Sequence, residues 1–225
     1  ELWVRYVHGL YQLWGDLRAK HPDVIWQSCS GGGGRADMGI LRLADQIWVS
    51  DNTEATARLR IQEGFSHIFP ANTMEAWVTD AQAKRVPLQF RFHVSMCGSL
   101  GVGGHLPHWT PDERALARQL IADYKEVRHI VQQGDQYRLR SPQAGAYSAV
   151  QYVAKDRSES VLFVFRTHLP DPAQLPTLRL RGLDPEALYS VDGMGAPRSG
   201  AAWMTAGLFV QIGDLESRML RITQK

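Results

Sequence analysis

Two features of this sequence could do chemistry: a run of four glycines and a downstream aspartate, Asp51. The glycines, Gly31–Gly34, follow Cys29 and the short apolar run Val24–Trp26. Glycine adopts positive φ freely and has no side chain, so backbone N–H groups in this loop can closely approach a phosphate or a polyhydroxylated ligand. No Gly-Lys-Ser/Thr follows the run, which excludes a Walker A loop. Taken alone, a glycine run is more often a flexible turn than a binding loop.

Asp51 stands where a ligand-facing residue would stand in a parallel α/β barrel. It follows the apolar run Ile47–Val49 and precedes a predicted helix that is expected to run through Ile61, with Gly64 as its C′ residue. Side chains just after a barrel strand lie at the carboxyl face, where the active sites of such barrels are found. The alternative is a structural role, because aspartate is a favoured N-cap residue and this helix is expected to begin at Asn52 or Thr53. The local pattern alone favours capping.

Alternating helices and strands are predicted for residues 1–134. Apolar residues at three- and four-residue steps predict a helix over residues 2–17. Thr110 followed by Pro111 and, three residues on, by Glu113 forms a capping box, so a second long helix begins there and is closed by Gly134. Between them we expect strands at 24–26, 47–50 and 67–70, a short helix at 37–43 and a loop from 70 to 79.

Residues 88–96 are open to two interpretations. Apolar and other residues alternate strictly there, which favours a strand. The competing interpretation is a helix that is followed by a strand at residues 99–102. About four strand–helix units fit before residue 134, half of the eight that a closed (β/α)₈ barrel needs.

Residues 135–225 have a different pattern, with short apolar runs separated by Pro, Gly and Asp clusters. Such spacing predicts an antiparallel β-sandwich, and we place the domain boundary between residues 134 and 135. The runs lie at residues 147–153, 161–165, 178–180, 188–191, 208–212 and 219–222.

Composition narrows the function classes. The net charge is only +2 over 225 residues, without a basic stripe, so nucleic acid is not an expected partner. The two cysteines, Cys29 and Cys97, are too far apart for metal-ligand spacing, and no stretch is apolar enough to span a bilayer. No signal peptide is visible, but the chain opens at Glu1 without Met. We expect a bacterial cytoplasmic protein, with secretion through an upstream signal as the alternative.

Five segments together carry a specific resemblance: Gln27–Gly39, Asp45–Glu54, Arg58–Gly64, Pro87–Leu88 and Met96–Gly101. Their order and residues resemble the α-galactosidases of glycoside hydrolase family 36, and the similarity covers most of the chain. The resemblance implies retaining hydrolysis of terminal α-galactosides of the melibiose or raffinose type. It implies galactose-containing oligosaccharides as partners and needs no metal or organic cofactor.

The resemblance also implies a fold, namely the second half of a (β/α)₈ TIM barrel followed by a C-terminal antiparallel β-sandwich. Residues 24–27 would form the fifth barrel strand and residues 47–50 the sixth. Residues 88–96 would be largely helical, and we follow the family there against the periodicity. A protein partner would be a second copy or the missing N-terminal part of the enzyme.

By the same resemblance, Asp51 matches the general acid/base of the family, which reverses the capping interpretation. Cys29 and the first glycines, Gly31 and Gly32, match positions that contact the galactose ring. Trp48 and Trp77 could stack on a sugar. Core packing is the more usual role of either ring, and Trp77 is the better candidate to border the pocket.

Parts of the family pattern are absent or altered. The family nucleophile lies in a Lys-Trp-Asp segment, and no such segment occurs in these 225 residues. We therefore expect a chain that carries half of an active site and is inactive alone. Gln27 stands where relatives often carry Glu, and we expect Arg35 and Asp37 to form an ion pair that holds the loop. The rival functions are a non-catalytic carbohydrate-binding or assembly fragment and a transferase or oligosaccharide synthase of the same family.

Overall fold

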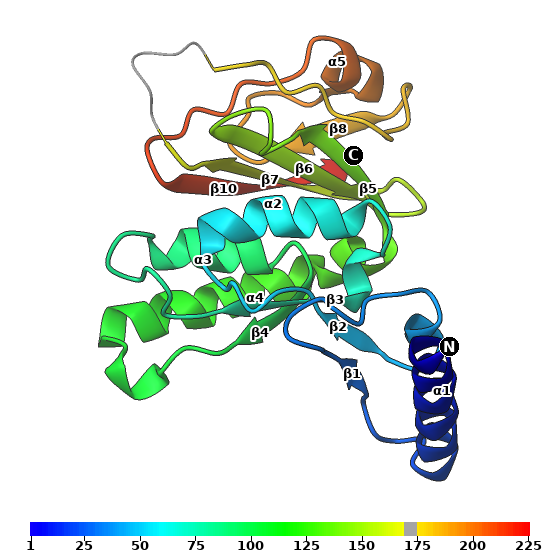
Figure 1. Cartoon of the computed structure of the whole chain (residues 1–225). Coiled ribbons are helices and arrows are strands. Elements are labelled where there is room, and N and C mark those ends of the chain that lie inside the picture. Colours follow the sequence, from blue (N-terminus) through cyan, green and yellow to red (C-terminus); the bar gives the residue numbers. More distant parts are fainter. Residues whose placement is uncertain (169–174) are drawn as a thin grey trace.

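A computed structural model describes residues 1–168 and 175–225 of the chain in three layers (Figure 1). A six-stranded antiparallel sheet forms one layer, three helices form the middle layer, and a four-stranded parallel sheet forms the third. The first helix, α1 (Leu2–Lys20), stands at the edge of the parallel sheet beside its first strand.

The parallel sheet has the strand order β1-β2-β3-β4, which is also the order along the chain. Each strand is short, and residues Trp48, Glu75 and Ser99 of three neighbouring strands lie in register. Parallel neighbours require crossover connections, and helices supply two of them here. The strands are β1 (Gln27–Ser28), β2 (Gln46–Trp48), β3 (Met74–Val78) and β4 (Ser99–Val102); the crossover helices are α2 (Ala55–Ser66) and α3 (Leu88–Ser95).

Helix α4 (Pro111–Gln133) joins the two sheets and begins at the predicted capping box. The Thr110 hydroxyl accepts a hydrogen bond from the Glu113 backbone N–H at 3.1 Å, and the Glu113 carboxylate accepts one from the Thr110 N–H at 2.8 Å. Both bonds satisfy N–H groups that a helix start leaves without partners. The prediction for this helix is confirmed at both ends.

The antiparallel sheet has the strand order β5-β6-β7-β10-β8-β9. Its outer face is covered by α5 (Gly200–Thr205) and by extended segments joined in a bridge between Leu178 and Leu208. These segments were expected as strands at 178–180 and 208–212, and a single bridge is what forms. The strands are β5 (Asp135–Arg140), β6 (Tyr147–Val153), β7 (Glu159–Arg166), β8 (Leu188–Val191), β9 (Arg198–Ser199) and β10 (Glu216–Gln224).

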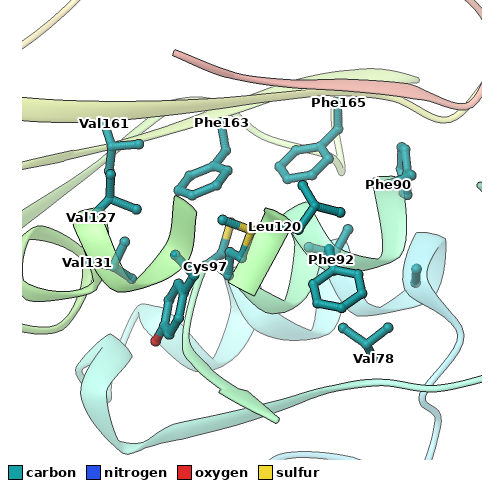
Figure 2. Packing of buried hydrophobic residues seen from close by; sticks show 14 of the residues in the cluster. Val78, Phe90, Phe92, Cys97, Leu120, Val127, Val131, Val161, Phe163 and Phe165 are labelled. Atoms are coloured by element: carbon teal, nitrogen blue, oxygen red, sulfur yellow. The ribbon is translucent and has the colours of Figure 1, made fainter. Parts of the chain in front are cut away.

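One hydrophobic core connects the middle helices to both sheets (Figure 2). Phe163 and Phe165 of β7 point toward α3 and α4, and Phe90 meets Phe165 edge-on with ring centroids 5.5 Å apart. Val78 of β3 closes the same cluster on the other side. Burial of this apolar area fixes the two sheets on opposite faces of the helical layer.

The region after β2 differs from the prediction. Helix α2 begins later than expected: its N-cap is Glu54, whose carboxylate accepts hydrogen bonds from the backbone N–H groups of Thr56 and Ala57 at 3.0 and 2.8 Å. Gly64 lies inside the helix, which ends at the C-cap residue His67. The predicted cap, Asn52 or Thr53, is therefore wrong, because the longer Glu54 side chain reaches two N–H groups of the first turn.

The segment that follows α2 was also assigned wrongly, whereas the helical interpretation of residues 88–96 is confirmed. Residues 67–70 are turns rather than a strand, and the strand lies at Met74–Val78, within the predicted loop. Residues 88–95 form a helix and Ser99–Val102 form the next strand, as the family resemblance implied and against the alternation.

Smaller shifts affect the first two loops. The strand expected at residues 24–26 forms at Gln27–Ser28 instead, and Ile25 is 75% exposed. The short helix expected at 37–43 is a single 3₁₀ turn, Ile40–Arg42. Within the described part of the chain, none of the helices combines the length and the apolar character that a membrane crossing requires.

Candidate active site

The loops after β1 and β2 lie against each other at the carboxyl edge of the parallel sheet. A Cβ atom on Gly32 would lie 3.1 Å from the backbone nitrogen of Asp51, and one on Gly33 would lie 2.5 Å from the carbonyl oxygen of Val49. Gly32 also has φ of +84°, which disfavours other residues. The glycine run is therefore a packed element that abuts the segment carrying Asp51, rather than a flexible turn.

Cys29 and Gly31 complete this loop. Cys29 is half-buried, and its thiol lies 3.9 Å from the Gly32 carbonyl oxygen, to which it donates. Gly31 has φ of +54°, and a Cβ there would meet nothing within 4 Å, so its backbone faces open space. The structure thus brings Cys29, Gly31 and Gly32 together with Asp51.

Arg35 and Asp37 hold the loop separately, and the predicted ion pair between them is not among the contacts of the described residues. The Arg35 guanidinium donates to the Cys29 carbonyl oxygen at 3.0 Å and to the Tyr6 hydroxyl at 3.1 Å. Asp37 accepts from the Tyr11 hydroxyl at 2.5 Å. Tyr6 and Tyr11 are side chains of α1, so α1 braces the glycine loop.

Asp51 is exposed at the carboxyl end of β2, and one of its oxygens accepts a hydrogen bond from the Trp48 indole nitrogen at 2.7 Å. The capping interpretation is wrong, because Glu54 caps the following helix. An indole N–H is only a donor, so it orients the carboxylate without competing for its proton.

Trp77 lies on β3, not in a loop, and 40% of it is exposed. Its ring packs against Trp48 with centroids 4.8 Å apart. Cβ atoms on Gly101 and Gly103 would lie 2.5 and 2.8 Å from the Trp77 ring, so glycines on and after β4 let the indole lie flat on the backbone. Trp77 is a fixed aromatic surface open to solvent on the face of the sheet that carries the Asp51–Trp48 pair.

Two buried charged residues that the sequence did not reveal lie beside this pair. Glu75 of β3 is 7% exposed and Arg58 of α2 is 2% exposed. Arg58 donates to the carbonyl oxygens of Ser50 at 3.2 Å and Glu75 at 2.6 Å, and its guanidinium lies 5.4 Å from the centre of the Trp48 ring. A charged residue at an expected helix or loop position gives no burial signal in the sequence, so neither residue stood out.

Burial shifts the proton affinities of both groups. It raises the pKa of the Glu75 carboxyl above its ordinary value, although the hydrogen bond from Trp77 and the charge of Arg58 offset part of the rise. Burial also lowers the pKa of Arg58 to about 10, against the opposing effect of Glu75. The Arg58 guanidinium remains charged at neutral pH, and the carboxyl group close enough to affect its pKa is that of Glu75.

Within the described ranges, 1–168 and 175–225, no group of three or more His, Cys, Asp or Glu side chains could hold a metal ion. The stacked pair His105 and His108, with centroids 3.9 Å apart, has no further ligand of that kind in the described chain. The residues that the structure gathers at this edge of the sheet are the exposed Asp51 carboxylate, the glycine loop and the partly exposed Trp77 indole.

Parallel strands with helical crossovers, and with polar loops gathered at their carboxyl ends, define part of a (β/α) barrel enzyme. The sequence matches the family model described as Melibiase over residues 1–134, and the model described as Glycosyl hydrolase family 36 C-terminal domain over residues 147–222. The chain belongs to this family, glycoside hydrolase family 36.

Named relatives agree with the family assignment. The chain is 42% identical to the probable alpha-galactosidase C of Aspergillus flavus over 221 residues, which are 96% of this chain and 29% of the relative. It is 39% identical to the alpha-galactosidase AgaA of Geobacillus stearothermophilus over 224 residues, 97% of this chain and 31% of that protein. The chain thus spans about three tenths of the length of these relatives.

Solved structures share the fold at the same level of identity. The crystal structure of AgaA aligns with a TM-score of 0.92 at 39% identity, covering 98% of this chain and 32% of that one. A variant of AgaA was crystallised with raffinose (TM-score 0.92, 38% identity) and another with stachyose (TM-score 0.92, 39% identity); each alignment covers 98% of this chain and 32% of the other. The α/β part and the C-terminal antiparallel part therefore match the second half of the barrel and the C-terminal domain of family 36.

Proposed function

We propose that this chain supplies the acid/base half of the active site of a retaining α-galactosidase, with Asp51 as the acid/base. The observation that carries the proposal is the exposed Asp51 carboxylate at the end of β2, hydrogen-bonded to Trp48 and backed by the glycine loop. Family membership and the relatives' names support the choice of α-galactoside as substrate.

In the proposed reaction, Asp51 donates its proton to the glycosidic oxygen as the bond to the anomeric carbon breaks. A carboxylate on another segment attacks that carbon and forms a glycosyl-enzyme. Asp51, now a carboxylate, takes a proton from water as the water attacks, and galactose leaves with retention. Retaining enzymes hold the two carboxyl groups about 5–5.5 Å apart, so the partner carboxylate must approach the open side of Asp51.

The proposed sugar site lies between the glycine loop and Trp77. Cys29, Gly31 and Gly32 would lie along the galactose ring, where the absence of side chains leaves room for an axial hydroxyl. Trp77 would border the site as an aromatic surface. The AgaA variants bound to raffinose and stachyose support oligosaccharides with terminal galactose as the substrate class.

Asp51→Ala in an intact enzyme that carries these residues tests the assignment. We expect hydrolysis of raffinose, which needs a protonated leaving oxygen, to fall by about 10²–10⁴-fold. For an aryl α-galactoside with a good leaving group, the rate of the glycosylation step should fall far less. Azide should restore part of the turnover of this substrate, because it attacks the glycosyl-enzyme in place of activated water. The control is Asp16→Ala, at an exposed aspartate on α1, which should leave the hydrolysis rates of both substrates unchanged. Small and equal losses on both substrates after Asp51→Ala would contradict the proposal.

The second candidate function is a non-catalytic carbohydrate-binding or assembly fragment. It is favoured by the parallel sheet, in which β1 and β4 each pair with one described neighbour and so present an open edge. Hydrolysis of p-nitrophenyl α-galactoside by the purified 225-residue chain, with and without azide, separates the two. No turnover under either condition together with measurable galactose binding supports the second candidate. Transfer to a sugar acceptor, as by an oligosaccharide synthase, would appear as a longer product.

A further inference from the structure

Glu75 has no part in the proposed reaction, yet its surroundings are unusual. It lies on β3 between apolar neighbours, is 7% exposed, and has one carboxylate oxygen without a hydrogen-bond partner in the described part of the chain. A buried carboxylate that is only partly hydrogen-bonded costs stability, and an apolar residue at this position would avoid that cost. Such a local cost is typical of residues kept for a role at a functional site.

The other oxygen of Glu75 accepts a hydrogen bond of 2.6 Å from the indole nitrogen of Trp77. The two residues are two positions apart on one strand, so both side chains lie on the face opposite Ala76 and Val78. Trp77 then meets Trp48 at 4.8 Å, and Trp48 donates to Asp51 at 2.7 Å. A continuous set of contacts therefore runs from the buried carboxylate to the exposed one.

We propose that Glu75 is a positioning residue that fixes the Trp77 ring and, through the packed Trp48, the orientation of the Asp51 carboxylate. The proposal rests on the proposed function, in which Asp51 is the acid/base. Trp77 is confined on three sides, by Trp48, by Gly101 and Gly103 on and after β4, and by the hydrogen bond to Glu75. That hydrogen bond is the polar contact that selects the ring orientation among those the packing permits.

The competing role for Glu75 is purely structural, as the counter-charge of buried Arg58. Two substitutions separate the roles. Glu75→Gln removes the charge and keeps a carbonyl oxygen that can accept from Trp77. Trp77→Phe removes the indole donor and keeps the Glu75 charge beside Arg58. A positioning role makes Trp77→Phe the damaging change for chemistry, whereas a counter-charge role makes Glu75→Gln the damaging change for stability.

The experiment measures kcat for a series of aryl α-galactosides with leaving groups of different acidity, in the intact enzyme. Misplacement of the acid slows poor leaving groups most, because they depend on proton donation. We expect Trp77→Phe and Glu75→Leu to lower kcat by about tenfold for the poorest leaving group and by less than about twofold for the best, the effect of one lost orienting hydrogen bond. Glu75→Gln should restore most of the loss seen in Glu75→Leu.

The matched control is Trp203→Phe, which removes an indole hydrogen bond of 3.0 Å to the Tyr189 carbonyl oxygen in the C-terminal domain. It should leave the leaving-group dependence unchanged. If Glu75→Leu does not fold, the leaving-group dependence of Trp77→Phe alone tests the positioning role, because this variant keeps Glu75 beside Arg58. Equal losses across the leaving-group series in Trp77→Phe would overturn the positioning role while Asp51→Ala still reported an acid/base. If Asp51→Ala did not slow the hydrolysis of raffinose, the proposed function itself would be overturned.

Discussion

Gly33 is the residue at which the glycine loop is least tolerant of a side chain. A Cβ there would lie 2.5 Å from the Val49 carbonyl oxygen, a backbone atom that cannot move alone. We expect Gly33→Ala to destabilise the chain by about 1–3 kcal/mol, because overpacking forces a backbone shift. The shift would displace Asp51 as well, so catalytic activity should fall together with stability.

Gly64→Ala is the matched control for this substitution. Gly64 lies inside α2, and a Cβ there would meet nothing within 4 Å. Alanine should stabilise the helix by about 0.5–1 kcal/mol, because glycine is a poor helix former. Urea unfolding of both variants measures the two effects, and a Gly33→Ala chain as stable as the wild type would contradict the packed-loop description.

At the residue scale, the local pattern of the sequence predicted the wrong helix cap, and the site roles implied by the resemblance stay predictions. Local pattern favoured capping for Asp51, and the cap is Glu54, three residues on, since its longer side chain reaches two N–H groups. Glu75 and Arg58 were missed because their burial depends on strands and helices that are distant in the sequence. Arg35 and Asp37 were expected to pair, but both contact α1, whose position the spacing of two residues cannot reveal.

At the scale of elements, the capping box of α4 offers a direct test. Thr110→Ala removes the acceptor for the Glu113 N–H and should lower stability by about 1 kcal/mol. The exposed residue Glu126 in the same helix provides the control, and Glu126→Ala should change stability by less than about 0.5 kcal/mol. Thermal unfolding of each variant is the measurement. Equal effects of the two substitutions would mean that the box contributes nothing.

Helix α3 shows why one element could not be predicted from periodicity. All of its residues except Gln89 are buried, so it has no solvent face to produce a 3.6-residue pattern. Two of its polar residues have partners outside the helix: Arg91 donates to the Thr79 carbonyl oxygen at 2.7 Å, and His93 contacts Ser217 at 2.8 Å. Their alternation with apolar residues imitates a strand. Strand β3 was hidden for a related reason, because the buried Glu75 interrupts its apolar run.

At the scale of the whole molecule, the two parts of the chain share one core and a polar contact. Helix α3 packs on β10, where Gln89 donates to the Ser217 carbonyl oxygen and His93 meets the Ser217 hydroxyl. The long helix at 111–133 and the strands β2, β6, β7, β8 and β10 could be predicted from spacing. This contact could not, because its partners are more than 120 positions apart. The domain boundary after residue 134 stays a prediction.

The buried contact at His93 makes the stability of the whole chain depend on pH. Burial, together with the nearby charge of Arg218, lowers the pKa of His93 to about 4; Ser217 and the Phe163 ring, which also face the imidazole, are uncharged. The unfolded chain therefore binds this proton more readily than the folded chain between pH 4 and the ordinary value of 6.5. The contribution is fully present above pH 6.5 and is lost as the pH falls toward 4, about 3 kcal/mol in all.

His93→Gln removes this titration and isolates it from the carboxylates that protonate over the same range. The measurement is urea unfolding of the wild type and of His93→Gln at about pH 7.5, 5.5 and 4.5, which lie above and between the two pKa values of the imidazole. The free energy of unfolding of the wild type should fall more steeply than that of the variant below pH 6.5. His8→Gln, at an exposed histidine on α1, should retain the wild-type slope. Parallel slopes for the wild type and His93→Gln would mean that His93 accepts its proton without unfolding, and that α3 can separate from β10 while the core persists.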